Sequence, residues 1–177
     1  MLPFGPRELA EIAMKIEQNG MAFYSALAER TKDKEAKELF SFMAKEEKQH
    51  FETFKQLADK LASYGVPEPY EADEYGDYIR QLIDSNIFSW DLDTAALAEK
   101  TSSPVEAIDL ALGFEKDSII FFVQFKKIVP EQENFAIDAL IDEENHHINR
   151  LLVMKKAITS TSDDFYRSQP KIGDAEK

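Results

Sequence analysis

Apolar residues recur every three to four positions through four long segments of the chain, with few glycines or prolines inside them. This periodicity predicts four amphipathic helices, at about 6–30, 34–63, 104–129 and 130–159. Pro104 suits the first turn of the third helix, and Pro130 starts the fourth. Helices of about 25 to 30 residues, each roughly 40 Å long, are typical of an antiparallel bundle.

The connections between these helices differ greatly in length. The first and second helices are separated by a few residues, as are the third and fourth, so each pair is predicted to form a hairpin. The segment 64–103 between the hairpins is too long for a structureless loop, and we expect short helices in it near 75–83 and 94–100. The predicted fold is therefore an all-α four-helix bundle over 1–159. The tail 160–177 is polar and contains a proline and a glycine, so we expect it to be flexible.

Composition narrows the classes of function. The 177 residues suffice for one domain, and the absence of cysteine excludes disulfides, thiolate metal sites and thiol catalysis. No apolar run is long enough for a transmembrane helix, and the first residues do not resemble a signal peptide, so a cytoplasmic protein is expected. A net charge of −13 argues against nucleic acid or a membrane surface as a partner, and it suits the attraction of cations.

Each of the three histidines has a glutamate three residues before it. The pairs are Glu47/His50, Glu143/His146 and Glu144/His147. Residues i and i+3 share a helix face, so each pair can direct an oxygen and a nitrogen towards one point. The last two pairs overlap. We choose Glu144 and His147 because the apolar residues of that helix lie on the same stripe, whereas His146 is expected at the surface.

The two predicted hairpins repeat each other. Glu47 and Glu144 are 97 residues apart, and similar apolar positions flank both of them. In the partner helices, Glu17 and Glu115 each interrupt a small or apolar face, with an offset of 98. Each hairpin thus supplies one glutamate from its first helix and a Glu/His pair from its second. The six predicted metal ligands are Glu17, Glu47, His50, Glu115, Glu144 and His147.

Four buried glutamates require compensation, because an isolated buried charge costs several kcal/mol. Two divalent cations would balance four carboxylates, and oxygen-rich ligation with one nitrogen per metal favours iron or manganese, with zinc as a redox-inactive substitute. We expect Glu47 and Glu144 to bridge the two metals. Glu46 and Glu143 could orient the imidazoles, although solvated glutamates are the favoured interpretation. Tyr24 is a candidate hydrogen-bond donor or oxidisable group beside the metals, or a plain core aromatic.

At these residues the chain resembles the ferritin-like superfamily, and most closely the rubrerythrins, from Glu8 to about Lys156. The motifs are Glu17-x6-Tyr24, Glu47-x-x-His50, Glu115 and Glu144-x-x-His147. The resemblance implies a homodimeric non-haem protein with two iron ions per chain that reacts with peroxide or dioxygen, the six residues above being the iron ligands. Two features depart from rubrerythrins. The cysteines of a rubredoxin-like domain are absent, which implies a separate electron-donor protein, and Ser118 stands where rubrerythrins carry an extra glutamate.

Three functions compete at this stage. The leading one is a di-iron oxidoreductase that reduces hydrogen peroxide or dioxygen, with Tyr24 as a catalytic candidate. The second is a ferroxidase that oxidises Fe(II) and handles the product. The third is a helical module without metal, in which apolar replacements of Glu17 and Glu115 would leave the protein stable. A protruding Phe42 and the exposed side of Phe121 and Phe122 are candidates for a subunit interface.

Overall fold

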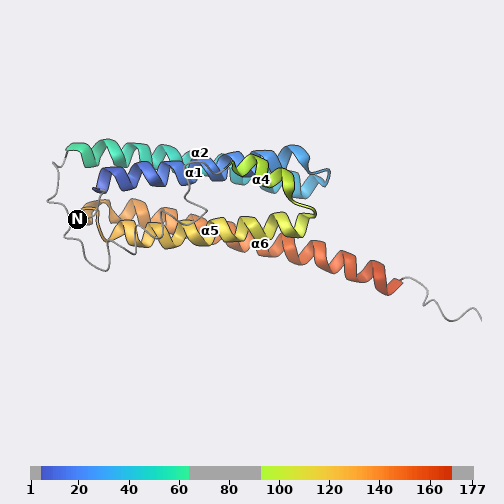
Figure 1. Cartoon of the computed structure of the whole chain (residues 1–177). Helices are drawn as coiled ribbons and strands as arrows, with labels where there is room; N and C mark the ends of the chain where they lie inside the picture. The colour runs from blue at the N-terminus through green and yellow to red at the C-terminus, as the bar shows by residue number, and fades with distance from the viewer. Residues whose placement is uncertain (1–4, 64–92, 169–177) are drawn as a thin grey trace, which may run out of the picture.

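The structure is a computed structural model that describes residues 5–63 and 93–168, apart from the side chains of residues 95 and 161–168. Its helices, labelled in Figure 1, are α1 (Pro6–Arg30), α2 (Lys34–Ser63), α4 (Thr94–Lys100), α5 (Pro104–Lys126), the 3₁₀ turn η1 (Glu131–Glu133) and α6 (Asn134–Ser168). The described part of the chain is all-α, as predicted.

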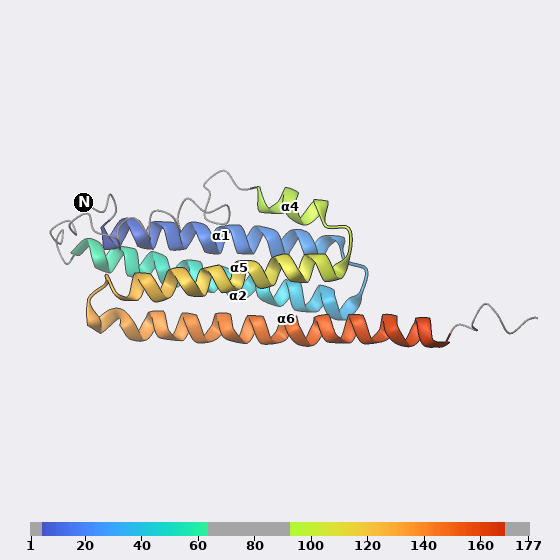
Figure 2. The ribbon, with the colours of Figure 1, turned by 60° about the horizontal axis from the view of Figure 1, so that its bottom comes forward.

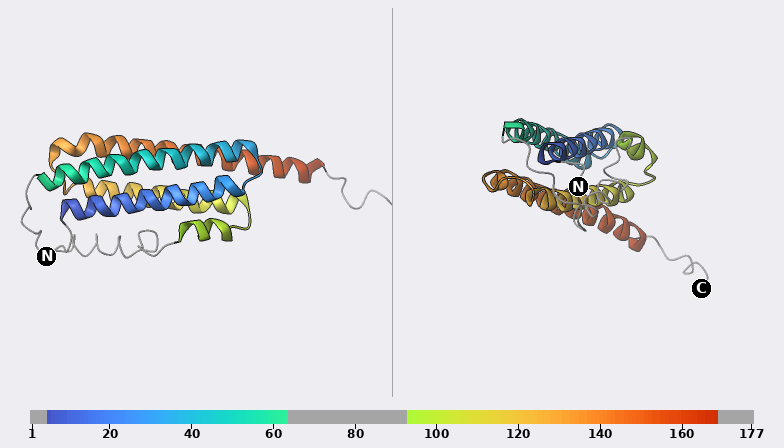
Figure 3. Two further views of the ribbon diagram at one scale, coloured as in Figure 1. Left: turned by 90° about the horizontal axis from the view of Figure 1, so that it is seen from above. Right: turned by 60° about the vertical axis from the view of Figure 1, so that its left-hand side comes forward.

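The four long helices form two hairpins that lie side by side. The helices α1 and α2 pack along each other, and so do α5 and α6 (Figures 1 and 3). The short helix α4 precedes α5 and lies against α1 on the outside of the bundle (Figure 2). None of the helices among the described residues carries an apolar stretch of the length needed to span a bilayer.

Local sequence signals account for most helix ends. Asp33 accepts a hydrogen bond from the backbone of Ala36 at the start of α2. Ser103 does the same for Glu106 at the start of α5, with Pro104 in the first turn. These are the side chains that satisfy the unpaired N–H groups of a helix start. The predicted bounds of the first two helices and of the helix at 94–100 are therefore confirmed.

The other bounds differ from the prediction. The helix α5 ends at Lys126 rather than near 129, and η1 intervenes before α6, because Pro130 has no N–H to donate and disfavours helical geometry before it. The helix α6 continues to Ser168, past the end expected near 159. The predicted short helix at 75–83 and the end of the tail lie outside the described residues.

Two apolar clusters fill the bundle, one on each side of a polar layer. Ile16 of α1 and Phe54 of α2 belong to one cluster, whereas Phe23 of α1 and Met43 of α2 belong to the other. The polar layer therefore includes Glu17 to Gly20 in α1 and Glu47 to His50 in α2. Phe121 and Phe122, 1% and 0% exposed, pack in the core, so the interface suggested for them is wrong.

Candidate metal centre

The six predicted ligands come from all four long helices and meet in the polar layer. These residues are at most 4% exposed, although each is a glutamate or a histidine. They are buried because each occupies the apolar stripe of its helix, one turn from core residues such as Ala13 in α1 and Leu151 in α6. The surface position expected for His146 is confirmed, since it is exposed.

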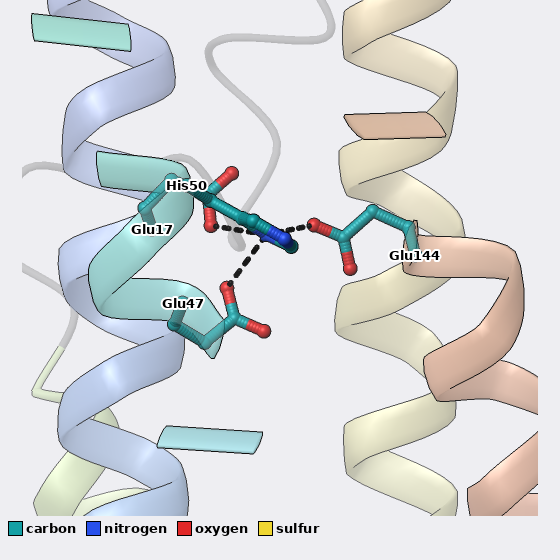
Figure 4. Close-up of side chains that lie close together, drawn as sticks. All are labelled: Glu17, Glu47, His50 and Glu144. Carbon is teal, nitrogen blue, oxygen red and sulfur yellow. Dashed lines mark ion pairs between the residues drawn. The ribbon is translucent and has the colours of Figure 1, made fainter. Parts of the chain in front are cut away.

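The six residues form two overlapping groups of four. Within each group one ligand atom per residue lies within 4.8 Å of all the others. The first group is Glu17, Glu47, His50 and Glu144, and the second is Glu47, Glu115, Glu144 and His147. Figure 4 shows the first group, whose side chains point towards one another from α1, α2 and α6. Glu47 and Glu144 belong to both groups, which is the arrangement expected of bridging carboxylates.

Both imidazoles present Nδ1 to the carboxylates. His50 Nδ1 lies 2.9 Å from Glu144 Oε1 and 3.5 Å from Glu17 Oε2. His147 Nδ1 lies 3.0 Å from Glu144 Oε2 and 3.5 Å from Glu115 Oε2. Each half of the site therefore combines one histidine nitrogen, one glutamate of its own and the two shared carboxylates.

Several of these buried atoms have no hydrogen-bond partner among the residues that the structure describes. They are both oxygens of Glu17, Oε1 of Glu47, Oε1 of Glu144 and Nδ1 of His50. His50 Nδ1 and Glu144 Oε1 are close enough for an ion pair but are not aligned for a hydrogen bond. A buried polar atom without a partner costs about 1–3 kcal/mol. Donor atoms that converge without satisfying one another fit a bound cation, and oxygen-rich ligation with one imidazole per group suits iron or manganese.

The family of the chain follows from comparison with known proteins. The family model described as Rubrerythrin matches residues 8–155, which include all six residues. The chain belongs to the rubrerythrin family. No curated protein sequence matches this family member.

Two solved structures are similar to this rubrerythrin-family chain. A crystal structure from Thermotoga maritima, described as a ferritin-like diiron-carboxylate protein, is 25% identical with a TM-score of 0.62. The match covers 86% of this chain and 95% of that one. A protein from Pyrococcus furiosus, described as hypothetical, is 21% identical with a TM-score of 0.61, covering 90% and 94% of the two chains. The ferritin-like fold is therefore shown, and the buried Glu/His cluster indicates a metal site.

Burial and charge crowding shift the proton affinities of the rubrerythrin site when no metal is bound. Burial, followed by repulsion from Glu144, raises the pKa of Glu115 to about 8. Burial and the neighbouring Glu47 raise the pKa of Glu17 well above its usual range. Burial opposes the charged form of His50, but the carboxylates of Glu144 and Glu17 outweigh it and raise its pKa to about 12. The metal-free site therefore retains protons that a cation would displace.

Tyr24 is a hydrogen-bond donor at the site, as one of the predicted interpretations proposed. Its hydroxyl donates to Glu115 Oε1, and its ring is 1% exposed in the core. Burial, followed by the charge of Glu115, raises the pKa of Tyr24 well above its usual value, so the phenol remains protonated.

Glu46 and Glu143, which immediately precede the two shared glutamates, make different contacts. Glu143 lies 2.8 Å from Nε2 of His50, so the interpretation of this residue as a purely solvated glutamate is wrong. It contacts the histidine of the other hairpin rather than the histidine of its own helix. The sequence missed this contact because helical periodicity relates residues within one helix only. Glu46 instead accepts a hydrogen bond from Gln49 at 2.6 Å.

A small cavity of about 20 Å³ adjoins the site between α1, α5 and α4. Its lining includes Asn19, Gly20, Thr94, Glu115 and Ser118. Ser118, where rubrerythrins have an additional glutamate, therefore borders this space. Asn19 is 7% exposed, and its Nδ2 finds no hydrogen-bond partner within residues 5–63 and 93–168. The volume is close to that required by one water molecule.

Proposed function

We propose that the protein is a non-haem di-iron oxidoreductase that reduces hydrogen peroxide or dioxygen with electrons from an external donor. The observation that carries this proposal is the pair of overlapping groups that share Glu47 and Glu144. Four carboxylates and two neutral imidazoles balance the charge of two divalent cations, so a pair of iron ions suits the buried cluster better than a single ion.

Six residues would hold the ions, and Tyr24 would place a proton beside them. Glu17 and His50 would hold one ion, Glu115 and His147 the other, and Glu47 and Glu144 both. When bound there, two iron ions would supply one electron each, which matches the two electrons and two protons that reduce hydrogen peroxide to two water molecules. The Tyr24 hydroxyl holds its proton at Glu115 Oε1, at the edge of the cavity. We therefore keep Tyr24 as the candidate catalytic residue.

The size of the cavity supports a small oxidant. A space of about 20 Å³ beside Glu47 and Glu115 accepts a molecule of the size of water or peroxide. Pockets that bury a drug-sized organic substrate measure roughly 300–1,000 Å³. Hydrogen peroxide or dioxygen is therefore a better substrate for this site than an organic hydroxylation target.

The test is the iron content per chain after anaerobic loading, followed by oxidation with peroxide or with dioxygen. We expect two ions per wild-type chain and loss of both in a His50→Ala/His147→Ala double variant. His146→Ala is the matched control, because this exposed histidine lies beside His147 but outside both groups. Faster oxidation by peroxide than by dioxygen would support a peroxidase. Failure of the wild-type chain to retain iron would refute the proposal and favour a helical module without metal.

The alternative is a ferroxidase that oxidises Fe(II) and passes on the product. The net charge of −13 favours it, because an acidic surface raises the local concentration of cations. The proposed assembly is a homodimer served by a separate electron-donor protein. Native mass distinguishes the two functions. A dimer supports the oxidoreductase, whereas a large hollow assembly would support iron storage.

A further inference from the structure

The internal repeat allows the two halves of the site to be compared residue by residue. Glu46 of α2 is equivalent to Glu143 of α6, since both immediately precede the shared glutamates. Tyr24 of α1 is equivalent to Phe122 of α5, at the same offset that relates Glu17 to Glu115. The six ligands and the preceding glutamates are thus repeated, whereas Tyr24 is replaced by Phe122 in the second half.

The first difference lies behind the histidines. His50 has Glu143 Oε2 at 2.8 Å from Nε2, the ring nitrogen that faces away from the four-residue group. An acceptor at this position holds the proton on Nε2, leaves the lone pair of Nδ1 for a cation and increases its basicity. The Glu143 side chain is 52% exposed, whereas the His50 side chain that it contacts is 1% exposed.

The other histidine lacks this support. His147 Nε2 is buried and has no hydrogen-bond partner among the described residues. Its ring meets the edge of Phe42 of α2, with centroids 6.4 Å apart. Glu46, the equivalent of Glu143, is engaged by Gln49 of its own helix at 2.6 Å. His147 therefore lacks, at Nε2, the acceptor that fixes the proton and the orientation of the His50 ring.

The second difference lies at the glutamates that are not shared. The Tyr24 hydroxyl donates to Glu115 and withdraws part of the carboxylate charge that a cation would use. Within the described part of the chain Glu17 receives no hydrogen bond on either oxygen, and Phe122 at the position equivalent to Tyr24 has no hydroxyl to donate one. The ligands Glu17 and His50 are thus stronger than their counterparts Glu115 and His147.

We propose that the two cation positions are inequivalent, that the position of Glu17 and His50 binds the more tightly and fills first, and that Glu143 is the positioning residue responsible. This inference rests on the proposed metal site, because it requires that both groups bind a cation. It requires neither a particular oxidant nor turnover.

The test is an anaerobic titration of the metal-free protein with Co(II), followed by the visible absorption of the bound ion. His50→Ala and His147→Ala identify which binding step belongs to which group. We expect Glu143→Ala to weaken the tighter step, the one that His50→Ala removes, by roughly 10–100-fold. Glu143→Gln retains an acceptor oxygen and should restore part of the loss. Glu46→Ala is the matched control and should change neither step.

The outcomes separate this inference from the proposed function. Equal effects of Glu143→Ala and Glu46→Ala would overturn it, as would a loss confined to the step that His147→Ala removes. Failure of wild-type protein to bind cobalt would instead contradict the metal site itself. Circular dichroism of each variant verifies the fold, and we expect no change because both glutamates are at least partly exposed.

Discussion

Gly20 of α1 lies beside the carboxylate of Glu47, which belongs to both groups of four. A Cβ atom at Gly20 would stand 3.1 Å from Glu47 Oε2 and 3.2 Å from its carboxyl carbon. Carbon contacts in protein interiors are most favourable at roughly 3.5–4.0 Å, so an added methyl group would displace the carboxylate. The absence of a side chain at Gly20 therefore determines where Glu47 lies.

This geometry predicts the outcome of a matched pair of substitutions. We expect Gly20→Ala to weaken cation binding by about tenfold, because the carboxylate common to both groups must shift. Gly113→Ala introduces the same methyl group where no other described part of the chain comes within 4 Å, so it should leave binding unchanged and stabilise α5 by about 1 kcal/mol. Cobalt titration and chemical denaturation measure the two effects. Unchanged cobalt binding by Gly20→Ala would show that Glu47 can move without loss.

At the residue scale, the sequence predicts positions on a helix better than contacts between helices. The choice of Glu144 and His147 over Glu143 and His146 was possible because only the first pair follows the apolar stripe, and the structure buries that pair. The contact of Glu143 with His50 could not be predicted, because it depends on how α6 is rotated against α2. The assignment of all six residues as metal ligands stays a prediction.

At the scale of the elements, the helix starts are encoded locally. Ser103 is the N-cap of α5, and its hydroxyl accepts a hydrogen bond from the backbone N–H of Glu106 at 3.1 Å. We expect Ser103→Ala to lower the free energy of unfolding by about 1 kcal/mol, because the N–H loses its partner. Chemical denaturation measures this change.

The matched control for this cap is Ser103→Asp, which keeps an acceptor oxygen at the N-cap and should retain most of the stability. Equal losses for the alanine and aspartate variants would argue against a capping role. The iron content should be the same in both variants, because Ser103 is remote from the six candidate ligands along α5.

A helix end is harder to predict where the sequence becomes polar but contains no proline or glycine to stop the helix. The polar composition after Thr159 predicts a tail, yet α6 continues to Ser168. Serine, threonine and aspartate lower helix propensity by less than about 1 kcal/mol each, whereas proline costs about 3 kcal/mol. The first proline in this region is Pro170, two residues beyond the observed end.

At the scale of the whole molecule, the metal-free centre makes stability depend on pH. The pKa of Glu115 rises from 4.5 to about 8, and that of His50 rises from 6.5 to about 12. A group with a raised pKa binds more protons in the folded state, so its contribution to stability is lost as the pH rises. The pKa of Glu144 is lowered, and its opposite contribution changes only below its usual value of 4.5.

We therefore expect the melting temperature of the chelator-treated protein to fall as the pH rises from about 5 to 8. Bound cations should reverse or flatten this dependence, because they replace the protons on the carboxylates. Thermal unfolding followed by circular dichroism, with and without cobalt, measures both curves. The His50→Ala/His147→Ala variant is the control for histidine protonation. A metal-free melting temperature that rises over this range would contradict the raised pKa values.

The overall architecture could be predicted from the sequence because the repeat and the helical periodicity both extend through it. The two hairpins, the all-α class and the position of the polar layer follow from the spacing of apolar residues. The Tyr24/Phe122 difference between the two halves can be read from the repeat, but the different contacts of Glu143 and Glu46 could not be predicted, since they depend on at least partly exposed side chains whose partners are set by packing. No apolar stripe constrains those residues.

Most of the close approaches between helices lie within the two hairpins, and fewer lie between them. Each group of four nevertheless draws donors from both hairpins, since Glu144 joins the first group and Glu47 joins the second. With cations in place, the hairpins can separate only if coordination bonds break. If both proposed cations bind, ion release would limit the rate of unfolding, and the lifetime of the protein under stress would be a kinetic property that the apolar core alone does not determine.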